Sequence, residues 1–280
     1  MPEKKHDTKI IVISNNKGGV AKSTTCTSIA HLAGKKGYRI LVIDLDTQMN
    51  ASELLGYPPR SKNSAGKPYP SVADYLSTFF EEDYDYPDVN KYILDTPYEN
   101  VDVMLGSFKM QSEFEQSLKT ASLENGDLME HLFVDIKQLN KYDLVFIDTP
   151  PHLGVHVTSA FRFADYLIAT TDPDKMGVEG VVKVCSYIQK REKKRLPVAQ
   201  IAGVIFCKVD ERNLLGKAIP IYVEQLNAMS IPAFMTVIPI SVDVSKSRTL
   251  SKPVTEVFPS SKVTKKYKLV LEELEGILNE

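Results

Sequence analysis

The chain has 280 residues, of which 43% are hydrophobic and 25% are charged. These fractions are typical of a globular protein with a sizeable core, and they exclude a disordered tail or a fibre. The 34 Lys and Arg residues almost balance the 36 Asp and Glu residues, which leaves a formal net charge of −2. This balance excludes a uniformly basic nucleic-acid-binding surface, although a total says nothing about local patches.

Neither a membrane anchor nor a secretion signal is evident in the sequence. No window approaches the roughly 18 apolar residues of a membrane-spanning helix, and the N-terminal segment MPEKKHDTK is polar. Cys26, Cys185 and Cys207 lie far apart and form no Cys-x-x-Cys pair. We therefore expect a cytoplasmic protein without a stable membrane anchor, whose cysteines are buried and reduced.

The chain opens with the pattern of a strand, a loop and a helix. A β-branched run covers residues 9–14, a Gly-containing loop follows, and a helical pattern covers 24–36. Helical patterns also separate most of the later apolar runs, which lie at 39–43, 142–147, 166–170, 200–207 and 233–238. This alternation predicts an α/β fold with a mainly parallel, twisted sheet and helices on both faces. Functional residues are then expected at the C-terminal ends of the strands.

Residues 57–141 interrupt this alternation. Helical patterns occur there near 71–80, 111–121 and 123–140. We expect a single domain over residues 1–280, with 57–141 as an insertion packed on it. The last segment, 261–280, has apolar residues at the spacing of one helix face, and we expect that helix to dock on the core.

A candidate phosphate-binding loop lies between the first strand and the first helix. A phosphate chain requires converging backbone N–H groups, a helix N-terminus, a cation and a hydroxyl group for Mg²⁺. Gly18 and Gly19 allow the backbone to approach closely, Lys22 supplies the cation, and Ser23 supplies the hydroxyl group. The candidate nucleotide-binding residues of the loop are Lys17, Gly18, Gly19, Val20, Ala21, Lys22, Ser23 and Thr24.

The match to the pattern G-x-x-x-x-G-K-[ST] is incomplete, because Asn16 and Ala21 stand at its two glycine positions. From the loop alone, a fortuitous Gly-Gly turn remains an alternative. Three carboxylates favour the nucleotide site. Asp148 ends an apolar run, where P-loop proteins place the carboxylate that serves Mg²⁺, and Asp44 and Asp46 end another. We expect these acids to converge on an ATP–Mg²⁺ site, rather than to be ordinary turn residues.

Three motifs together resemble one family. They are K-G-G-V-A-K-S-T, L-V-I-D-L-D-T-Q-M-N-A-S and Y-D-L-V-F-I-D-T-P-P, and they resemble the ParA/MinD family of deviant Walker ATPases, in its ParA (Soj-like) DNA-partition branch. The segments 203–215 and 237–254 resemble later parts of that family. The likeness covers residues 9–56 and 142–279, whereas 57–141 matches only loosely. Thr47 stands where the family commonly has proline.

The resemblance implies a P-loop NTPase-type fold and roles for individual residues. Lys17 would reach the partner's phosphates across an ATP-dependent homodimer. Asp44 would position the attacking water, and Lys17, Lys22 and Asp44 are the candidate catalytic residues. Ser23 and Asp148 would hold Mg²⁺, with Asp44 one layer further from the ion. Two later positions are also implied: Pro239 beside adenine, and Gly154 in a loop that senses the γ-phosphate.

A local basic patch lies near the C-terminus. Residues 244–268 contain seven basic residues and one acid, a local net charge of +6. Such a patch, doubled in a dimer, would bind double-stranded DNA without sequence preference and in a salt-sensitive manner. A merely solvated basic face is the alternative. The candidate DNA-binding residues are Arg212, taken from the resemblance, and Lys246, Arg248 and Lys252 from the patch. The basic tract 190–195 is interpreted instead as a helix end, where cations are favoured.

By resemblance, the expected function is ATP-dependent segregation of plasmid or chromosome DNA. A ParB-like centromere-binding protein would stimulate hydrolysis, and the ATP-bound form would associate with the nucleoid. The main alternative is a MinD-like positioning ATPase that acts on a membrane or another cargo. The acids Glu272, Glu273 and Glu275 in the last helix argue against binding to an anionic membrane. Amidoligase-type relatives that phosphorylate a small substrate also remain open.

His152 and His156 are four residues apart and could chelate a metal ion. A third ligand is not evident from the sequence, so we expect two histidines with ordinary protein partners.

Overall fold

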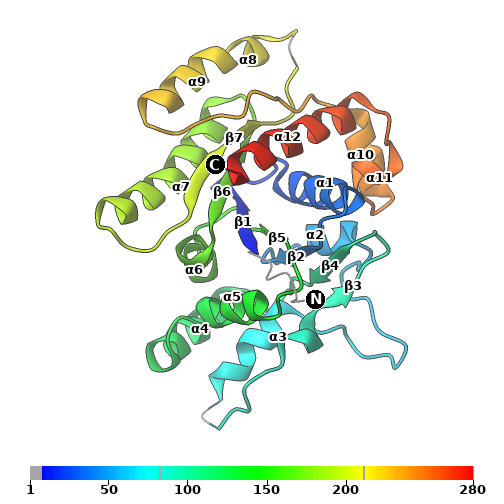
Figure 1. The fold of residues 1–280 in the computed structure, drawn as a ribbon, viewed down its shortest axis with the longest axis vertical. Helices are drawn as coiled ribbons and strands as arrows, with labels where there is room; N and C mark the ends of the chain where they lie inside the picture. Colours follow the sequence, from blue (N-terminus) through cyan, green and yellow to red (C-terminus); the bar gives the residue numbers. More distant parts are fainter. Residues whose placement is uncertain (1–7, 82, 211, 280) are drawn as a thin grey trace.

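The fold is built around one central β-sheet (Figure 1). The computed structural model describes residues 8–81, 83–210 and 212–279. Within these residues the sheet has seven strands, in the order β3-β4-β2-β5-β1-β6-β7. All neighbouring strands are parallel except β3 and β4. The predicted mainly parallel sheet is therefore confirmed. The strands are β1 Lys9–Ser14, β2 Ile40–Asp44, β3 Leu94–Asp95, β4 Val101–Met104, β5 Leu144–Asp148, β6 Tyr166–Thr171 and β7 Gln200–Phe206.

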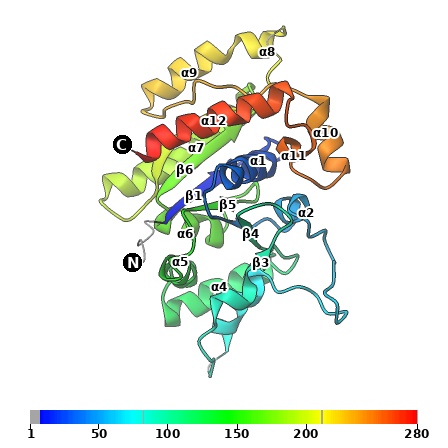
Figure 2. The ribbon, with the colours of Figure 1, turned by 45° about the vertical axis from the view of Figure 1, so that its right-hand side comes forward.

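Helices cover both faces of the sheet (Figures 1 and 2). In β1, Ile10 and Val12 belong to the core beneath α3 to α7, whereas Ile11 and Ile13 belong to the core beneath α1, α2 and α12. Strands buried on both faces read as continuous apolar runs, which explains why they were recognisable in the sequence. The helices are α1 Lys22–Lys35, α2 Asn50–Leu54, α3 Val72–Ser77, α4 Ser112–Asn125, α5 Leu128–Gln138, α6 Val155–Phe163, α7 Lys175–Lys193, α8 Leu214–Lys217, α9 Ile219–Ala228, α10 Val242–Thr249, α11 Val254–Val257 and α12 Lys262–Leu278, with 3-10 turns η1 Thr78–Phe80 and η2 Val89–Tyr92.

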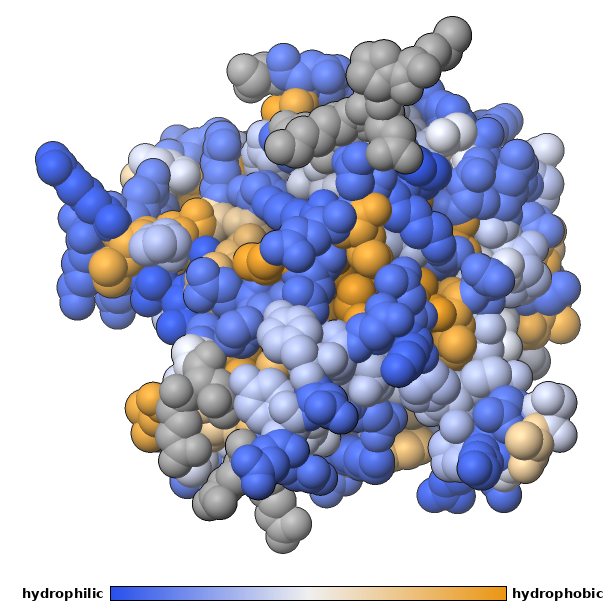
Figure 3. Space-filling model, turned by 60° about the horizontal axis from the view of Figure 1, so that its bottom comes forward, coloured by the Kyte–Doolittle hydropathy of each residue, from blue (hydrophilic) through white to orange (hydrophobic). Residues whose placement is uncertain are grey.

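Residues 57–141 contribute strands to the sheet as well as helices. β4 pairs in parallel with β2, with Val101 opposite Ile40, and β3 pairs antiparallel with β4. The sequence patterns did not predict these two strands. Helices α3, α4 and α5 correspond to the helical patterns expected there, with shifted boundaries. Seen from the end of the molecule that carries α3 and α4, the surface is mainly hydrophilic, with hydrophobic side chains in separate groups (Figure 3).

The apolar run 233–238 is not a strand, so the expected strand there is wrong. The segment lies beside β7, but it forms only isolated bridges, from Ala233 to Val204 and from Pro239 to Val209. The two bridges lie at the ends of the run, and pairing is lost in its middle. There the backbone N–H groups of Met235 and Thr236 donate to the Glu273 carboxylate instead of to β7.

The C-terminal helix α12 docks on the core, as expected. Its apolar face is buried against α1, and the hydroxyl groups of Tyr267 and Thr25 share a hydrogen bond of 3.1 Å. The Glu273 carboxylate accepts hydrogen bonds from the backbone N–H groups of Met235 and Thr236, at 2.8 and 2.9 Å. None of the helices in the described ranges combines the length and the apolar character needed to cross a membrane.

Candidate active site

The site forms where three parallel strands end side by side. β5 lies between β1 and β2, and Asp148 at its end is opposite both Ile13 of β1 and Asp44 of β2. The loop after β1 therefore starts next to the carboxylates that end β2 and β5. Open parallel sheets bind their ligands at this edge, outside the carboxyl ends of the strands.

The loop between β1 and α1 has the backbone that a phosphate cradle requires. Gly19 and Ala21 both have left-handed backbone, with φ of 75° and 66°. Ala21 precedes the first residue of α1, and no side chain caps that helix N-terminus in the described structure. Its N–H groups, together with the helix dipole, are therefore available to an anion. The Lys22 side chain folds across the loop, and its Nζ donates to the Lys17 carbonyl oxygen at 3.0 Å.

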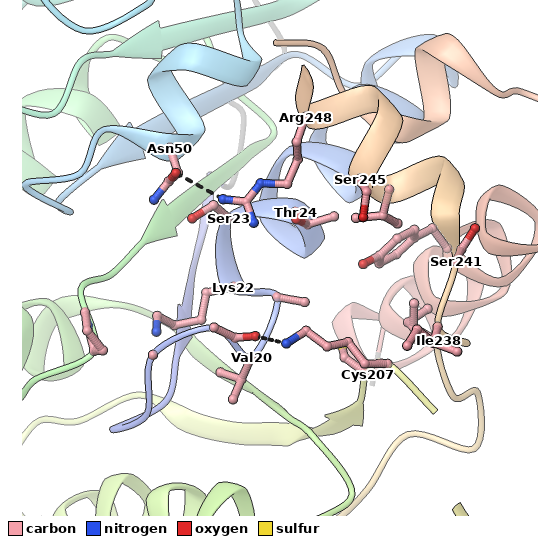
Figure 4. A pocket seen from close by; sticks show the side chains of 18 of the residues that line it. Val20, Lys22, Ser23, Thr24, Asn50, Cys207, Ile238, Ser241, Ser245 and Arg248 are labelled. Carbon is pink, nitrogen blue, oxygen red and sulfur yellow. Dashed lines mark hydrogen bonds between the residues drawn. The ribbon is translucent and has the colours of Figure 1, made fainter. Parts of the chain in front are cut away.

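A cavity of about 490 Å³ opens above this loop (Figure 4). The loop from Gly18 to Thr24 forms one wall, and Pro239 and its neighbours form another. The structure thus places the predicted nucleotide-binding residues Gly18 to Thr24 around the same cavity as Pro239. Further lining residues are Asp46, Gln48, Asn50, Pro151, Cys207, Lys208, Ile238, Ile240, Ser241, Val244, Ser245, Arg248 and Tyr267.

Asp148 is a fully buried carboxylate close to the Ser23 hydroxyl. Its exposed fraction is 0%, and neither carboxylate oxygen has a hydrogen-bond partner within the described part of the chain. Burial raises the pKa of Asp148 well above its usual value, and the neighbouring Asp44 raises it further. Burial lowers the pKa of the Lys22 ammonium, and the charges of Asp148 and Asp46 oppose that shift. The Ser23 hydroxyl lowers the pKa of Asp148 against the effects of burial and Asp44, and a buried carboxylate beside Ser23 and Lys22 fits the ligand set of a divalent cation.

Asp44, predicted as a catalytic carboxylate, is not among the described residues that line the cavity. Its carboxylate is fully buried and accepts hydrogen bonds from the Ser52 N–H at 2.9 Å, the Ser52 hydroxyl at 2.7 Å and the Asp46 N–H at 3.0 Å. Burial raises the pKa of Asp44 to about 6, against the lowering effect of these hydrogen bonds. Asp46 lines the cavity instead. In the described chain, the carboxylates of Asp44, Asp46 and Asp148 do not meet in one tight cluster of the kind that holds a metal ion.

Lys17 is engaged within its own chain. Its Nζ lies 2.7 Å from Asp174 and 3.6 Å from Asp172, in the turn between β6 and α7. Burial lowers the pKa of the Lys17 ammonium, but its hydrogen bond and ion pair with Asp174 outweigh this effect and leave the pKa raised.

The candidate DNA-binding residues come from two segments, Arg212 from the loop after β7 and the other three from α10 and the residues just after it. Arg212 is exposed, and its guanidinium is bound to the carboxylate of Asp210 at 2.9 and 3.0 Å. Lys246 and Lys252 are exposed on and just after α10. Arg248 belongs to the nucleotide-sized cavity, where it donates to the Asn50 side chain at 3.2 Å (Figure 4).

Sequence reasoning missed several residues around the loop. Lys208 donates to the Gly19 carbonyl oxygen and lies 3.6 Å from Asp172. Asn15 is buried, and its amide donates to the carbonyl oxygens of Thr170 and Gly177 at 2.7 and 3.2 Å. The position of Lys208 directly after the β7 run was a usable signal, because strand ends meet at the site. The partners of Asn15 lie more than 150 residues away and left no local signal.

Comparisons with known proteins agree with this geometry. A family model described as an AAA domain matches residues 8–200. The chain is 27% identical over 259 residues to the sporulation initiation inhibitor protein Soj of Bacillus subtilis, covering 92% of this chain and 95% of Soj. It is 24% identical over 270 residues to the chromosome-partitioning ATPase Soj of Thermus thermophilus, covering 94% of each chain. The solved structure of the septum site-determining protein MinD from Pyrococcus horikoshii, complexed with Mg-ADP, shares the fold, with a TM-score of 0.74, 22% identity and 97% of both chains covered.

The sheet is mainly parallel, a glycine-containing loop joins its first strand to its first helix, and two adjacent strands end in acids. Together these features define a P-loop NTPase. The chain belongs to the family matched by the AAA-domain model, and within it to the ParA/MinD ATPases of the Soj-like type. It is therefore a partition or positioning ATPase.

Proposed function

We propose that this protein is a DNA-partition ATPase whose ATP-bound form is a homodimer that binds double-stranded DNA without sequence preference. A ParB-like centromere-binding protein stimulates its weak hydrolysis and releases the DNA. The observation that carries the proposal is the cavity in which the phosphate loop, Asp46 and Pro239 face one another. Two similar proteins are named a chromosome-partitioning ATPase and a virulence plasmid ParA family protein, and these names support DNA as the cargo.

In this proposal the loop binds the phosphates of ATP. The N–H groups at the start of α1 and the Lys22 ammonium face the phosphate oxygens. Ser23 and Asp148 hold Mg²⁺, which neutralises phosphate charge when it is bound. Because burial disfavours the ionised carboxylate of Asp148, a cation there also satisfies a costly buried group.

Asp46 takes the role that the resemblance assigned to Asp44. A residue that positions the attacking water must reach the cavity, and Asp46 lies on its wall. Asp44 instead holds the loop after β2 in place, because it binds both the Asp46 N–H and two donors of Ser52. Asp44 is thus a positioning residue in this account.

Lys17 links nucleotide binding to dimerisation. In the single chain its ammonium is neutralised by Asp174 and Asp172. In the proposed dimer it leaves these partners and binds the phosphates of the nucleotide in the other subunit, a charge-stabilising role like that of an arginine finger. Dimerisation then requires ATP, because without phosphates the ion pairs with Asp174 and Asp172 are the better environment for Lys17.

DNA binding rests on lysines that are exposed and lie outside the cavity. Lys246 and Lys252 belong to the basic segment 244–268 near α10, and both are exposed. Neutralising DNA phosphates with lysine releases counterions, so affinity falls steeply with salt. Pairing two chains doubles the number of contacts, which makes DNA binding depend on ATP.

A MinD-like positioning ATPase is the second candidate, and the fold shared with MinD favours it to that extent. A membrane-binding tail would need a free basic amphipathic helix. Here the apolar face of α12 is buried, and Glu273 and Glu275 are engaged with the rest of the chain. Pelleting with anionic liposomes in the presence of ATP, without DNA retention, would favour this second candidate.

The nucleotide site is tested by Lys22→Ala. Loss of a buried, charge-assisted contact should weaken ATP binding by about 10- to 100-fold. Lys35→Ala at the other end of α1 is the matched control, because Lys35 pairs with Glu256 at the surface. Binding of a fluorescent ATP analogue measures both variants. Equal affinity of Lys22→Ala and the control would refute the phosphate role of the loop.

A further inference from the structure

We propose that Glu115, His152 and His156 form a binding site for a transition metal ion of the Zn²⁺ class, separate from the nucleotide cavity. The carboxylate comes from α4, His152 from the loop after β5, and His156 from the first turn of α6. One ligand atom of each residue lies within 4.8 Å of the others, and within the described ranges this is the one group of three such residues. The residues are separated in sequence by up to 41 positions, so the fold brings them together.

Two of the three separations between ligand atoms are close to those of a tetrahedral metal site. Glu115 Oε1 lies 3.0 Å from His156 Nδ1 and 3.4 Å from His152 Nε2. Bonds of about 2.0–2.1 Å to Zn²⁺ in tetrahedral geometry place neighbouring ligand atoms about 3.3 Å apart. Two imidazoles and one carboxylate are also a common Zn²⁺ ligand set, in which water takes the fourth position.

The burial of His156 indicates that something is missing from its surroundings. The ring is 0% exposed, and in the described structure neither of its nitrogens makes a directed hydrogen bond. Glu115 Oε1 is likewise buried, and its close polar contacts are the two histidine rings. A buried polar atom with no partner at all, such as His156 Nε2 in the described structure, costs about 1–3 kcal/mol. The simple alternative is an ion pair between Glu115 and His156 without a metal ion, and the second ring nitrogen of His156 has no hydrogen-bond partner within the described residues in either arrangement.

The backbone makes room for this cluster at Gly154. A Cβ atom at that position would overlap the Glu115 carboxylate and press against the His156 ring. Gly154 is the residue before α6 and has an ordinary extended backbone, so turn geometry does not demand glycine there. The glycine instead allows the α4 carboxylate to reach the two histidines.

The ligand chemistry separates this site from the Mg²⁺ site. Imidazole nitrogens favour Zn²⁺, Ni²⁺ or Cu²⁺, whereas Mg²⁺ prefers oxygen ligands. A bound ion would tie α4 to the loop of His152. That loop also contains Pro151, which lines the nucleotide-sized cavity next to Gly18. The site thus joins residues 57–141 to the loop that follows Asp148.

The test uses Co²⁺ and Zn²⁺ as probes of the full-length protein in the presence of excess Mg²⁺. Tetrahedral Co²⁺ has a characteristic visible absorption, and Zn²⁺ should displace it with one ion per chain. Glu115→Gln and His152→Asn should each lower the affinity by about tenfold or more. Glu130→Gln removes an exposed carboxylate from α5, a helix that packs on α4 and α6, and serves as the matched control. Asp148→Asn controls for metal bound at the nucleotide site.

The proposal expects binding to persist in Glu130→Gln and Asp148→Asn and to be lost in Glu115→Gln and His152→Asn. Circular dichroism should show that these variants stay folded, since His152 is exposed and Glu115 is only partly buried. Equal Co²⁺ affinity in all five proteins would overturn the site, as would a wild-type protein that binds no Co²⁺ in excess Mg²⁺. In the second case the cluster is an ion pair only.

Discussion

Lys17 Nζ lies 2.7 Å from the Asp174 carboxylate of the same chain. The lysine proposed to serve the partner's nucleotide is thus held in place by an internal acid. Asp174 also caps α7, because its other oxygen accepts a hydrogen bond from the Gly177 N–H at 2.7 Å. Asparagine caps helices as well as aspartate does, but it carries no charge. Asp174→Asn therefore removes the ion pair with Lys17 and keeps the cap of α7.

We expect Asp174→Asn to strengthen ATP-dependent dimerisation by about two- to fivefold, since partly exposed ion pairs contribute about 0.2–1 kcal/mol. Sedimentation equilibrium with a non-hydrolysable ATP analogue measures the change. Asp172→Asn is the control with a smaller expected effect, because its distance to Lys17 is 3.6 Å. Weaker dimers in Asp174→Asn would show that Asp174 assists the dimer rather than competing with it.

Asp46→Ala should abolish hydrolysis while ATP binding and ATP-dependent dimers remain. The reason is its place on the cavity wall, from which it can orient a water molecule. Asp44→Ala should instead lower the free energy of unfolding, by about 1–3 kcal/mol, because the donors of Ser52 and the Asp46 N–H lose their acceptor. Phosphate release and size-exclusion chromatography distinguish the two. A stable Asp44→Ala protein that only fails to hydrolyse would return the water-positioning role to Asp44.

Asp44 also predicts a pH dependence of stability. Its pKa is raised to about 6 in the folded chain, above the unfolded value of about 3.9. The contribution of the Asp44 carboxyl group to the free energy of unfolding is therefore fully present below the unfolded pKa, and it is lost as the pH rises through 6. Without nucleotide or metal, the stability of the wild type relative to Asp44→Asn should fall between pH 4 and 7, by on the order of 2–3 kcal/mol. Urea unfolding across this range measures it, and a constant difference would contradict the buried, proton-binding carboxyl.

Ala21 has a left-handed backbone that glycine adopts more easily. Its φ is 66°, a conformation that costs an L-residue roughly 1–2 kcal/mol. Ala21→Gly should therefore raise the free energy of unfolding by up to about 1 kcal/mol. This figure is what is left after the greater conformational entropy of glycine in the unfolded chain has offset part of the gain. Ala30→Gly within α1 is the control, and it should destabilise by about 1 kcal/mol. Thermal unfolding that shows destabilisation in both variants would contradict the strain at Ala21.

Lys246→Glu combined with Lys252→Glu should weaken DNA binding without changing ATP affinity. Fewer phosphate contacts should also make the salt dependence shallower, by about two units of slope per chain. Arg248→Glu should weaken ATP binding as well, because Arg248 lines the cavity. Charge reversal of Lys190 and Lys193, in the last turn of α7, is the control. Unchanged retention in gel shifts after the Lys246 and Lys252 changes would show that the patch is merely solvated.

The sequence predicted those parts of the molecule whose signals are local. The buried strands β1, β2 and β5 are continuous apolar runs, and the phosphate loop follows one of them directly. β4 was missed because its four residues include Asp102, and because its pairing with β2 is formed across distant sequence. The run 233–238 has strand composition, but the N–H groups of Met235 and Thr236 in its middle bind Glu273 of α12, a distant partner that the local pattern does not show.

The residues of the site also divide into those with a local sequence signal and those placed by distant contacts. Glycines and Lys22 predicted the loop, but which of two neighbouring acids faces the cavity depends on Ser52, which lies in α2. The partner of Lys17 is 157 positions away, and the carboxylate beside His152 and His156 comes from α4. Such contacts follow from tertiary packing and cannot be predicted from the spacing of residues in the sequence.

The proposal as a whole depends on DNA binding that ATP controls. The most direct measurement is co-sedimentation of the protein with double-stranded DNA in ATP, in ADP and without nucleotide, at low and high salt. We expect retention with ATP alone, and a strong loss of that retention at the higher salt. Equal retention in all three nucleotide states, or none with ATP at low salt, would contradict a partition ATPase that binds DNA as an ATP-dependent dimer.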